Sequence, residues 1–179
     1  MTNSNLVFTN MKLLLKTFSL IALIGAISSC GNEASQEGKS NNGNSQITGL
    51  TFSGKDVEEQ FQHYIHLKTA LVYSDVKEAK SGAAMIMKNT SDSALKEILT
   101  KISEANDIEV QRTHFSDVSE RITALVGASI SSGEIYQQYC PMAFNNEGGY
   151  WLSTEKAIRN PYFGDKMLKC GKVTKTIKK

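Results

Sequence analysis

The sequence predicts a mainly α-helical fold: an antiparallel, up-down four-helix bundle with an irregular, cysteine- and aromatic-rich C-terminal segment packed on it. From Ser53 to about Arg121 the chain contains no proline, and its apolar residues recur at helical spacing. Beyond Gly127 the amino-acid composition changes: both prolines and two of the three cysteines fall within residues 129–171. Glycine, serine and aromatic residues also gather there, which is typical of turns and short elements.

The first two helices are expected at about residues 54–73 and 75–88. Ser53 is the expected N-cap of the first helix. Asp75 followed three residues later by Glu78 is typical of a capping box that opens the second. One face of each helix carries the apolar side chains, which are Val57, Phe61, Tyr64, Ile65, Leu71 and Val72 in the first and Val76, Ala79, Ala83 and Ile86 in the second.

The third and fourth helices are expected at about residues 93–104 and 106–127, after a polar break at residues 89–92. Their apolar lines are Leu95, Ile98, Leu99 and Ile102, then Ile108, Phe115, Val118, Ile122 and Leu125. Because the loops between the four predicted helices are short, antiparallel packing of neighbours is expected.

The N-terminal residues predict export. Lys12 and Lys16 precede an apolar run at residues 18–27, and two serines then precede Cys30. This order predicts a secretory signal peptide at residues 1–29, with Met11 as an alternative start. A cysteine that follows small residues is where a lipoprotein is acylated, so Cys30 is the expected lipidation site; an ordinary signal with an incidental cysteine is the alternative.

Residues 30–52 are the lipidated cysteine and a flexible tether, since Gly, Ser, Asn and Gln dominate them. Residues 53–179 then form one domain. We expect it in the bacterial cell envelope, lipid-anchored and facing the periplasm, with the outer membrane favoured. The lysine-rich residues 169–179 are interpreted as a frayed, solvated end.

Charge and motifs exclude several functions. The net charge is +2 with scattered basic residues, so a nucleic-acid partner is not expected. The sequence contains no Gly-x-Ser-x-Gly elbow, zinc-protease helix, phosphate loop or Cys-x-x-Cys motif, so an enzyme is not expected. His63 and His66 lie three apart on the first helix and are interpreted as a solvated pair.

Two sulfur-containing clusters are the candidate site. Cys140 precedes Met142 by two residues, and Met167 precedes Cys170 by three. Thiolate and thioether sulfurs are soft donors that favour Cu(I) or Ag(I), and His114 on the fourth helix could add an imidazole. In an oxidising compartment the two cysteines could instead form a disulfide, whose ~31-residue loop would contribute about 3.5 kcal/mol. Both alternatives stay open.

Several segments resemble the family catalogued as domain of unknown function 3347, and the resemblance spans roughly Gly54 to Ile177. The segments are YCPMA (139–143), YWLS (150–153), IRNPYFG (158–164), MLKCG (167–171), KTALV (68–72) and RTHFSDVS (112–119). The resemblance implies a mostly helical domain of exported lipoproteins, one that is also appended to periplasmic adaptor subunits of copper/silver efflux pumps. It implies no activity and no residue roles.

Two functional hypotheses follow. The first is a lipid-anchored domain that binds Cu(I) or Ag(I) through Cys140, Met142, Met167 and Cys170, with or without His114, and supports metal handling or works with an efflux adaptor. The alternative is a non-catalytic interaction module stabilised by a Cys140–Cys170 disulfide. In that case the expected partner or ligand surface consists of Trp151, Asn160, Pro161, Tyr162 and Phe163.

Overall fold

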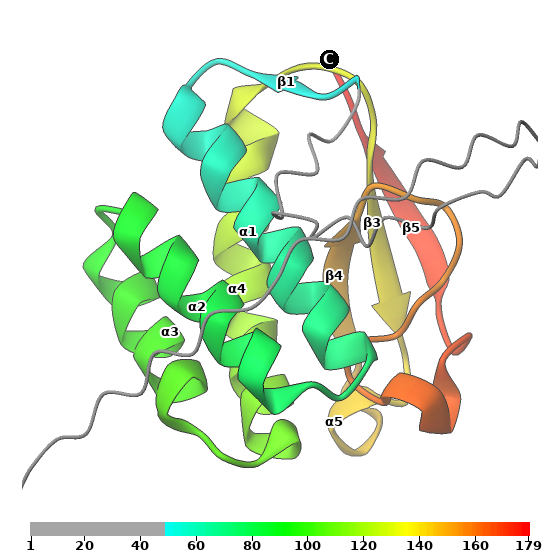
Figure 1. Ribbon diagram of the computed structural model, residues 1–179. Helices are drawn as coiled ribbons and strands as arrows, with labels where there is room; N and C mark the ends of the chain where they lie inside the picture. The colour runs from blue at the N-terminus through cyan, green and yellow to red at the C-terminus, as the bar shows by residue number, and fades with distance from the viewer. Residues whose placement is uncertain (1–48) are drawn as a thin grey trace, which may run out of the picture. The chain divides into compact units, whose positions relative to one another are not determined.

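The fold is mainly helical, with two small antiparallel sheets (Figure 1). The computed structural model describes residues 49–179. The predicted signal peptide, Cys30 and the tether up to residue 48 lie outside the described residues. The elements are β1 (Thr51–Phe52), α1 (Lys55–Val72), α2 (Val76–Asn89), α3 (Ser93–Glu104), α4 (Ile108–Ser129), β2 (Ile130–Ser132), β3 (Ile135–Cys140), α5 (Ala143–Asn146), β4 (Gly149–Ser153), η1 (Gly164–Met167) and β5 (Lys172–Ile177).

Three of the four long helices begin at an aspartate. The carboxylate of Asp75 accepts a hydrogen bond from the backbone N–H of Glu78, and Asp92 and Asp107 cap α3 and α4 in the same way. Each cap satisfies backbone donors that the first turn of a helix leaves free. Helix α1 differs from the expectation, since its N-cap is Gly54. Ser53 instead hydrogen-bonds the Ser131 side chain at 3.0 Å.

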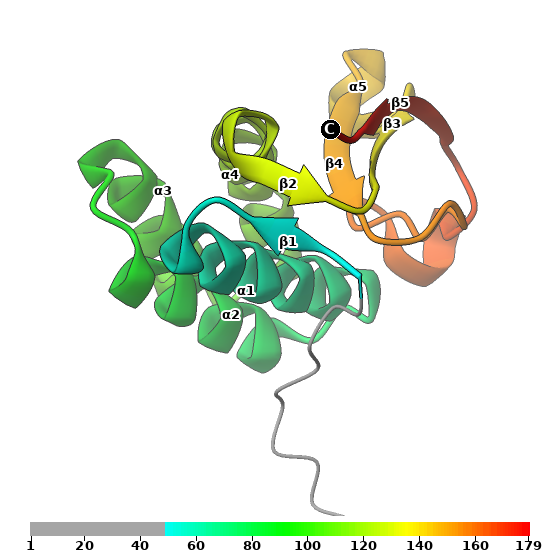
Figure 2. The same cartoon turned by 90° about the horizontal axis from the view of Figure 1, so that it is seen from above.

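The four long helices lie side by side on one side of the described unit (Figures 1 and 2). Helix α1 packs on α2 and α4, and α3 packs on the same two helices. The approach of α1 to α2 is close at Gly82, where an added Cβ would lie 3.0 Å from the backbone of Leu67. No helix within residues 49–179 is both long enough and apolar enough to cross a membrane.

Residues 50–52, predicted to be the end of the tether, belong to the folded domain. Leu50 is buried, and β1 pairs antiparallel with β2, with Thr51 opposite Ser132. Figure 2 shows this two-stranded sheet above the ends of α1 and α4. The pairing joins the start of the domain to the segment that follows α4.

Residues 129–171, predicted to be irregular, and the predicted frayed tail together contain a complete three-stranded sheet, so both predictions are wrong. Strand β3 lies in the middle, with β4 and β5 antiparallel on its two sides. Lysines 172 and 175 belong to β5. The connection between β3 and β4 turns through positive φ angles at Asn145, Asn146 and Gly148. Strand pairing between distant segments overrode the weak local pattern.

The outer edge of β4 is sealed by two tyrosines. Strand β4 ends the sheet, so part of its backbone has no strand partner. The Tyr64 hydroxyl on α1 accepts a hydrogen bond from the Leu152 N–H at 2.9 Å, and the Tyr162 hydroxyl donates to the Tyr150 carbonyl. Burial raises the pKa of both tyrosines above the usual range, so both hydroxyls stay protonated.

Aromatic rings connect the helices to the sheet. Tyr64 on α1 stacks on Phe115 of α4 with ring centroids 5.3 Å apart, and Phe115 contacts Tyr162 at 6.0 Å. Tyr162 also meets Trp151 of β4 edge-on at 5.8 Å. All four side chains are buried, so helices and sheet share one hydrophobic core.

Candidate functional site

The two cysteines of the domain lie next to each other. Cys140 is the last residue of β3 and is fully buried, whereas Cys170 lies between η1 and β5 and is half-buried. Their Sγ atoms are 3.3 Å apart, and both cysteines are free thiols. The structure thus brings residues 140 and 170 together, and we call them the cysteine pair.

Backbone contacts fix the position of Cys170. Its N–H donates to the Met167 carbonyl at 3.0 Å, and its own carbonyl accepts from Asn160 Nδ2 at 2.9 Å. Gly171 follows with a φ of +143°, and an added Cβ there would lie 2.9 Å from the Tyr139 carbonyl. The chain can pass this closely over β3 only because residue 171 has no side chain.

Asn160 organises the loop that leads to Cys170. Its side chain is fully buried; besides holding Cys170, its Oδ1 accepts from the Tyr162 N–H at 2.8 Å. Its N–H donates to the Leu168 carbonyl, and its carbonyl accepts from the Gly164 N–H. Four hydrogen bonds through one residue tie the 160–164 turn to the residues that flank Cys170.

The hydrogen bond between the two thiols sets their chemistry. It raises the pKa of Cys170 above its ordinary value, and burial and the proximity of Cys140 act in the same direction. Cys170 therefore stays protonated at neutral pH. A reactive cysteine needs a lowered pKa, which Cys170 lacks, and an ion that binds Cys170 must displace its proton.

The other predicted ligands are Met142, Met167 and His114. Met167 ends η1 and is half-buried, and Met142 is 46 % exposed in the turn after β3. His114 is half-buried on α4, next to the core residue Phe115. In residues 49–179, no three His, Cys, Asp or Glu side chains converge into a possible metal site. His114, Cys140 and Cys170 therefore do not form such a group.

The predicted aromatic surface is a core instead. Trp151 and Asn160 are fully buried, Pro161 and Tyr162 are buried, and Phe163 is half-buried. The prediction of an exposed binding surface at these residues is wrong. Sequence composition shows that large aromatic residues are clustered, but it cannot distinguish packing against a helix from display to solvent.

Arg112 is a structural residue that sequence reasoning missed. It is only 3 % exposed, and its guanidinium donates to the carbonyls of Pro161 at 2.9 Å and Leu71 at 2.8 Å. It also contacts the Ser74 hydroxyl and the Glu109 carboxylate, each at 2.9 Å. Arg112 thus fastens the 160–164 turn to the end of α1. The available signal was its place on the apolar face of α4, three residues before Phe115.

Residues 61–133 match the family model described as "Protein of unknown function (DUF3347)". The match runs from α1 to just beyond β2, so both cysteines lie outside it. The chain matches no curated protein and no solved structure.

Proposed function

We propose that this member of the DUF3347 family of proteins of unknown function, matched over residues 61–133, binds a soft metal ion, Cu(I) or Ag(I). The proposal rests on the cysteine pair. The observation that carries the proposal is the 3.3 Å separation of two unbridged sulfurs. Thiolates are the donors that such ions prefer.

The cysteine pair fits one ion in size and access. Metal–sulfur bonds of about 2.3 Å let a single ion touch two sulfurs up to roughly 4.6 Å apart. Cys170 is half-buried and offers an entry side, whereas the fully buried Cys140 shields the ion from water. Met142 and Met167 are the proposed additional thioether ligands, since each lies within three residues of a cysteine.

Proton release gives the proposal a pH dependence. The raised pKa of Cys170 means that the thiol binds its proton more tightly than an ordinary cysteine, and the ion must displace it. Apparent affinity should therefore rise with pH, up to tenfold per unit for each proton released, until the pH exceeds the raised pKa.

Anaerobic titration with Cu(I) against a chromophoric Cu(I) chelator tests the proposal. Every protein should carry Cys30→Ser, because the chain has three cysteines and only Cys140 and Cys170 should then remain. We expect one equivalent of Cu(I) to bind and expect Cys140→Ser and Cys170→Ser each to weaken binding at least a hundredfold. Met142→Leu and Met167→Leu should weaken it less.

Met85→Leu is the matched control, since Met85 is half-buried on α2, away from the sulfur clusters in the sequence. It should leave Cu(I) affinity unchanged. Absence of a stoichiometric complex, or binding that survives Cys140→Ser, would refute the metal proposal. Circular dichroism of each variant separates loss of ligand from loss of fold.

A second candidate is a structural disulfide, favoured by the same short distance. Free sulfurs at 3.3 Å need only a small approach to reach the ~2.05 Å of a disulfide. Such a bond would fasten the loop before β5 to the end of β3, and it would support a non-catalytic interaction module. Quantifying free thiols in protein purified from its own compartment tests this: full oxidation that resists mild reductants favours the disulfide over the metal site.

The cellular setting is also a proposal. We propose that Cys30 is lipidated and anchors the domain, facing the periplasm, at the outer membrane, where it would hand its ion to a heavy-metal efflux adaptor. The support is the order of charged, apolar and small residues before Cys30 and the family resemblance. Mass spectrometry of the mature N-terminus should find an acylated residue 30, and an unmodified N-terminus elsewhere would refute the anchor.

The arrangement of the helices has a finer proposed form as well. We propose that α1 to α4 form an antiparallel up-down bundle, supported by the packing of α1 and α3 on both α2 and α4. An experimental structure should then give neighbouring helices crossing near 20°. Crossing angles near 50° would instead indicate globin-like packing.

A further inference from the structure

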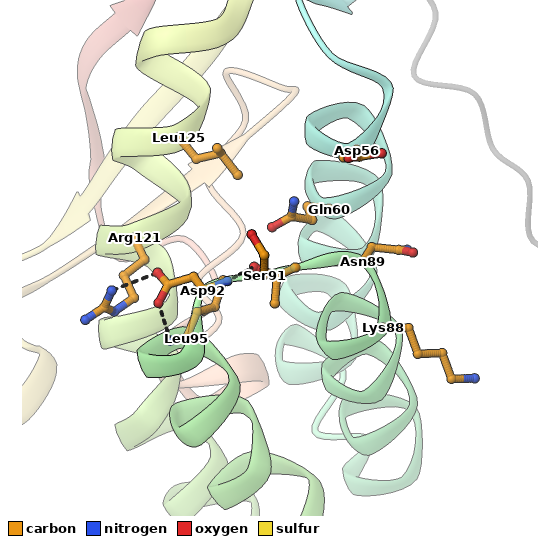
Figure 3. A pocket seen from close by; sticks show the side chains of 10 residues that line it. Asp56, Gln60, Lys88, Asn89, Ser91, Asp92, Leu95, Arg121 and Leu125 are labelled. Carbon is orange, nitrogen blue, oxygen red and sulfur yellow. Dashed lines mark hydrogen bonds and ion pairs between the residues drawn. The ribbon is translucent and has the colours of Figure 1, made fainter.

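A cavity of about 380 Å³ lies away from the cysteine pair, between α1, α4 and the linker that joins α2 to α3. Its volume is within the range of small-molecule sites. Figure 3 shows its lining seen from close by. The lining residues are Asp56, Gln60, Lys88, Asn89, Thr90, Ser91, Asp92, Leu95, Arg121 and Leu125.

Gln60 carries an unsatisfied polar group at this cavity. The residue is only 6 % exposed, and its Oε1 has no hydrogen-bond partner among residues 49–179. A buried acceptor without a donor is unfavourable, so native structures usually supply one from protein, water or ligand. Figure 3 shows the Gln60 side chain pointing from α1 toward the linker and α4. Because this oxygen is out of contact with solvent, a half-turn of the terminal amide torsion, which is soft, is needed to direct it into the cavity.

The charged groups around the cavity leave an acceptor unpaired. Asp92 and Arg121 neutralise each other at 2.8 Å, and the other Asp92 oxygen caps α3. In Figure 3 the side chains of Lys88 and Arg121 point outward, away from Gln60. Asp56 lies one helical turn before Gln60 and forms no ion pair within the described part of the chain. The unpaired groups on α1 are thus a carboxylate and an amide oxygen.

Two leucines supply an apolar wall. Leu95 on α3 is buried and Leu125 on α4 is half-buried, and both line the cavity. A ligand here would meet hydrogen-bond acceptors on the α1 side and aliphatic carbon on the opposite side. This combination suits a molecule with a donor-rich cationic head and a short aliphatic chain.

We propose that the cavity binds a small primary ammonium ion with an aliphatic chain. One N–H donates to Gln60 Oε1, the positive charge lies by the Asp56 carboxylate, and the chain packs on Leu95 and Leu125. An ammonium group offers three donors and no acceptor, which matches an acceptor left without a partner. The site is independent of the cysteine pair.

The test uses n-butylamine, which is protonated at pH 7, and follows the full chain by NMR during titration. We expect saturable shifts of the Gln60, Ser91 and Leu125 amides. Two probes of similar chemistry act as controls: n-butanol has the chain without the charge, and tetramethylammonium has the charge without N–H donors. Both should bind at least tenfold more weakly than n-butylamine.

Variants locate the interaction. Gln60→Leu should weaken n-butylamine binding at least tenfold without lowering the melting temperature, because it removes an unpaired acceptor. Gln62→Leu is the matched control on the same helix and should leave affinity unchanged, since Gln62 bonds Glu58 and does not line the cavity. Asp56→Asn, at an exposed position, should also weaken binding and covers the case in which Gln60→Leu fails to fold.

Three results would overturn the proposal. They are an absence of saturable shifts at the cavity, equal affinity for n-butanol, and unchanged affinity in both Gln60→Leu and Asp56→Asn. Each would mean that the cavity holds ordered water only. Cys140→Ser should bind n-butylamine as the wild type does, so the outcome is distinct from that of the metal titration.

Discussion

Replacing Arg112 by methionine should cost several kcal/mol of folding free energy. The guanidinium is 3 % exposed and donates to two backbone carbonyls, those of Pro161 and Leu71. A hydrogen bond from a charged group contributes about 1.5–3 kcal/mol, so loss of both should cost about 3–6 kcal/mol. The Glu109 carboxylate is 56 % exposed and rehydrates when its partner is gone, so that ion pair adds little. Methionine refills most of the volume of the arginine stem.

Arg121→Met is the matched control on the same helix. Arg121 pairs with Asp92 at 2.8 Å, but the Arg121 side chain is 41 % exposed and the Asp92 side chain 40 % exposed. An exposed pair contributes about 0.2–1 kcal/mol, so the expected loss is several times smaller than at Arg112.

Urea unfolding followed by the fluorescence of Trp151, the one tryptophan of the chain, measures both losses. The midpoint should fall while the slope with denaturant stays constant. A domain of this size is stable by about 5–15 kcal/mol, so Arg112→Met should remain measurable or unfold outright. Equal losses in Arg112→Met and Arg121→Met would refute the role assigned to Arg112.

Three further predictions follow from particular contacts. Asn160→Ala removes the bonds to the Cys170 carbonyl and the Tyr162 N–H, so we expect a loss of about 2–3 kcal/mol and faster alkylation of Cys170 in the native state. Gly148→Ala should destabilise, since φ is +89° and the new Cβ would clash with the Tyr139 hydroxyl. Gly127→Ala in α4 meets nothing within 4 Å and should stabilise by about 0.5–1 kcal/mol. A lower melting temperature for Gly127→Ala than for Gly148→Ala would contradict this. Hydrogen bonds from the Leu95 N–H and Arg121 lower the pKa of Asp92, so its contribution is present above the unfolded pKa of about 4 and is lost as pH falls through the lower folded pKa. Asp92→Asn should therefore destabilise at pH 7, and urea unfolding at decreasing pH should show the difference from the wild type shrinking.

Much of the helical half was predictable because its signals are local. The cap at Asp75 and the 3.6-residue apolar spacing each involve residues only a few positions apart in the chain. Helix α3 begins and ends where expected. The choice of Cys140 and Cys170 as the candidate site also came from sequence, since two thiols and two thioethers are a rare combination. Whether an ion binds there stays a prediction.

The rest depended on contacts between distant segments. The sheet escaped prediction because β5 pairs with β3 across more than thirty residues, and neither strand has a strong local pattern. Trp151 and Tyr162 were misassigned to a surface because burial is decided by what packs against a residue, here Phe115 from α4. Arg112 stabilises a turn about fifty residues away, which no local rule could reveal.

The sequence by itself placed the ends of the four long helices to within about two residues and showed which sulfurs are available, because periodicity, capping and side-chain chemistry depend on neighbouring residues. Only the tertiary structure decided that the two thiols stand 3.3 Å apart, that the aromatic cluster is core and that Gln60 Oε1 has no hydrogen-bond partner in the described part of the chain. Those outcomes depend on how segments far apart in the chain share the buried space, and that is set by packing and hydrogen-bond satisfaction over the whole domain.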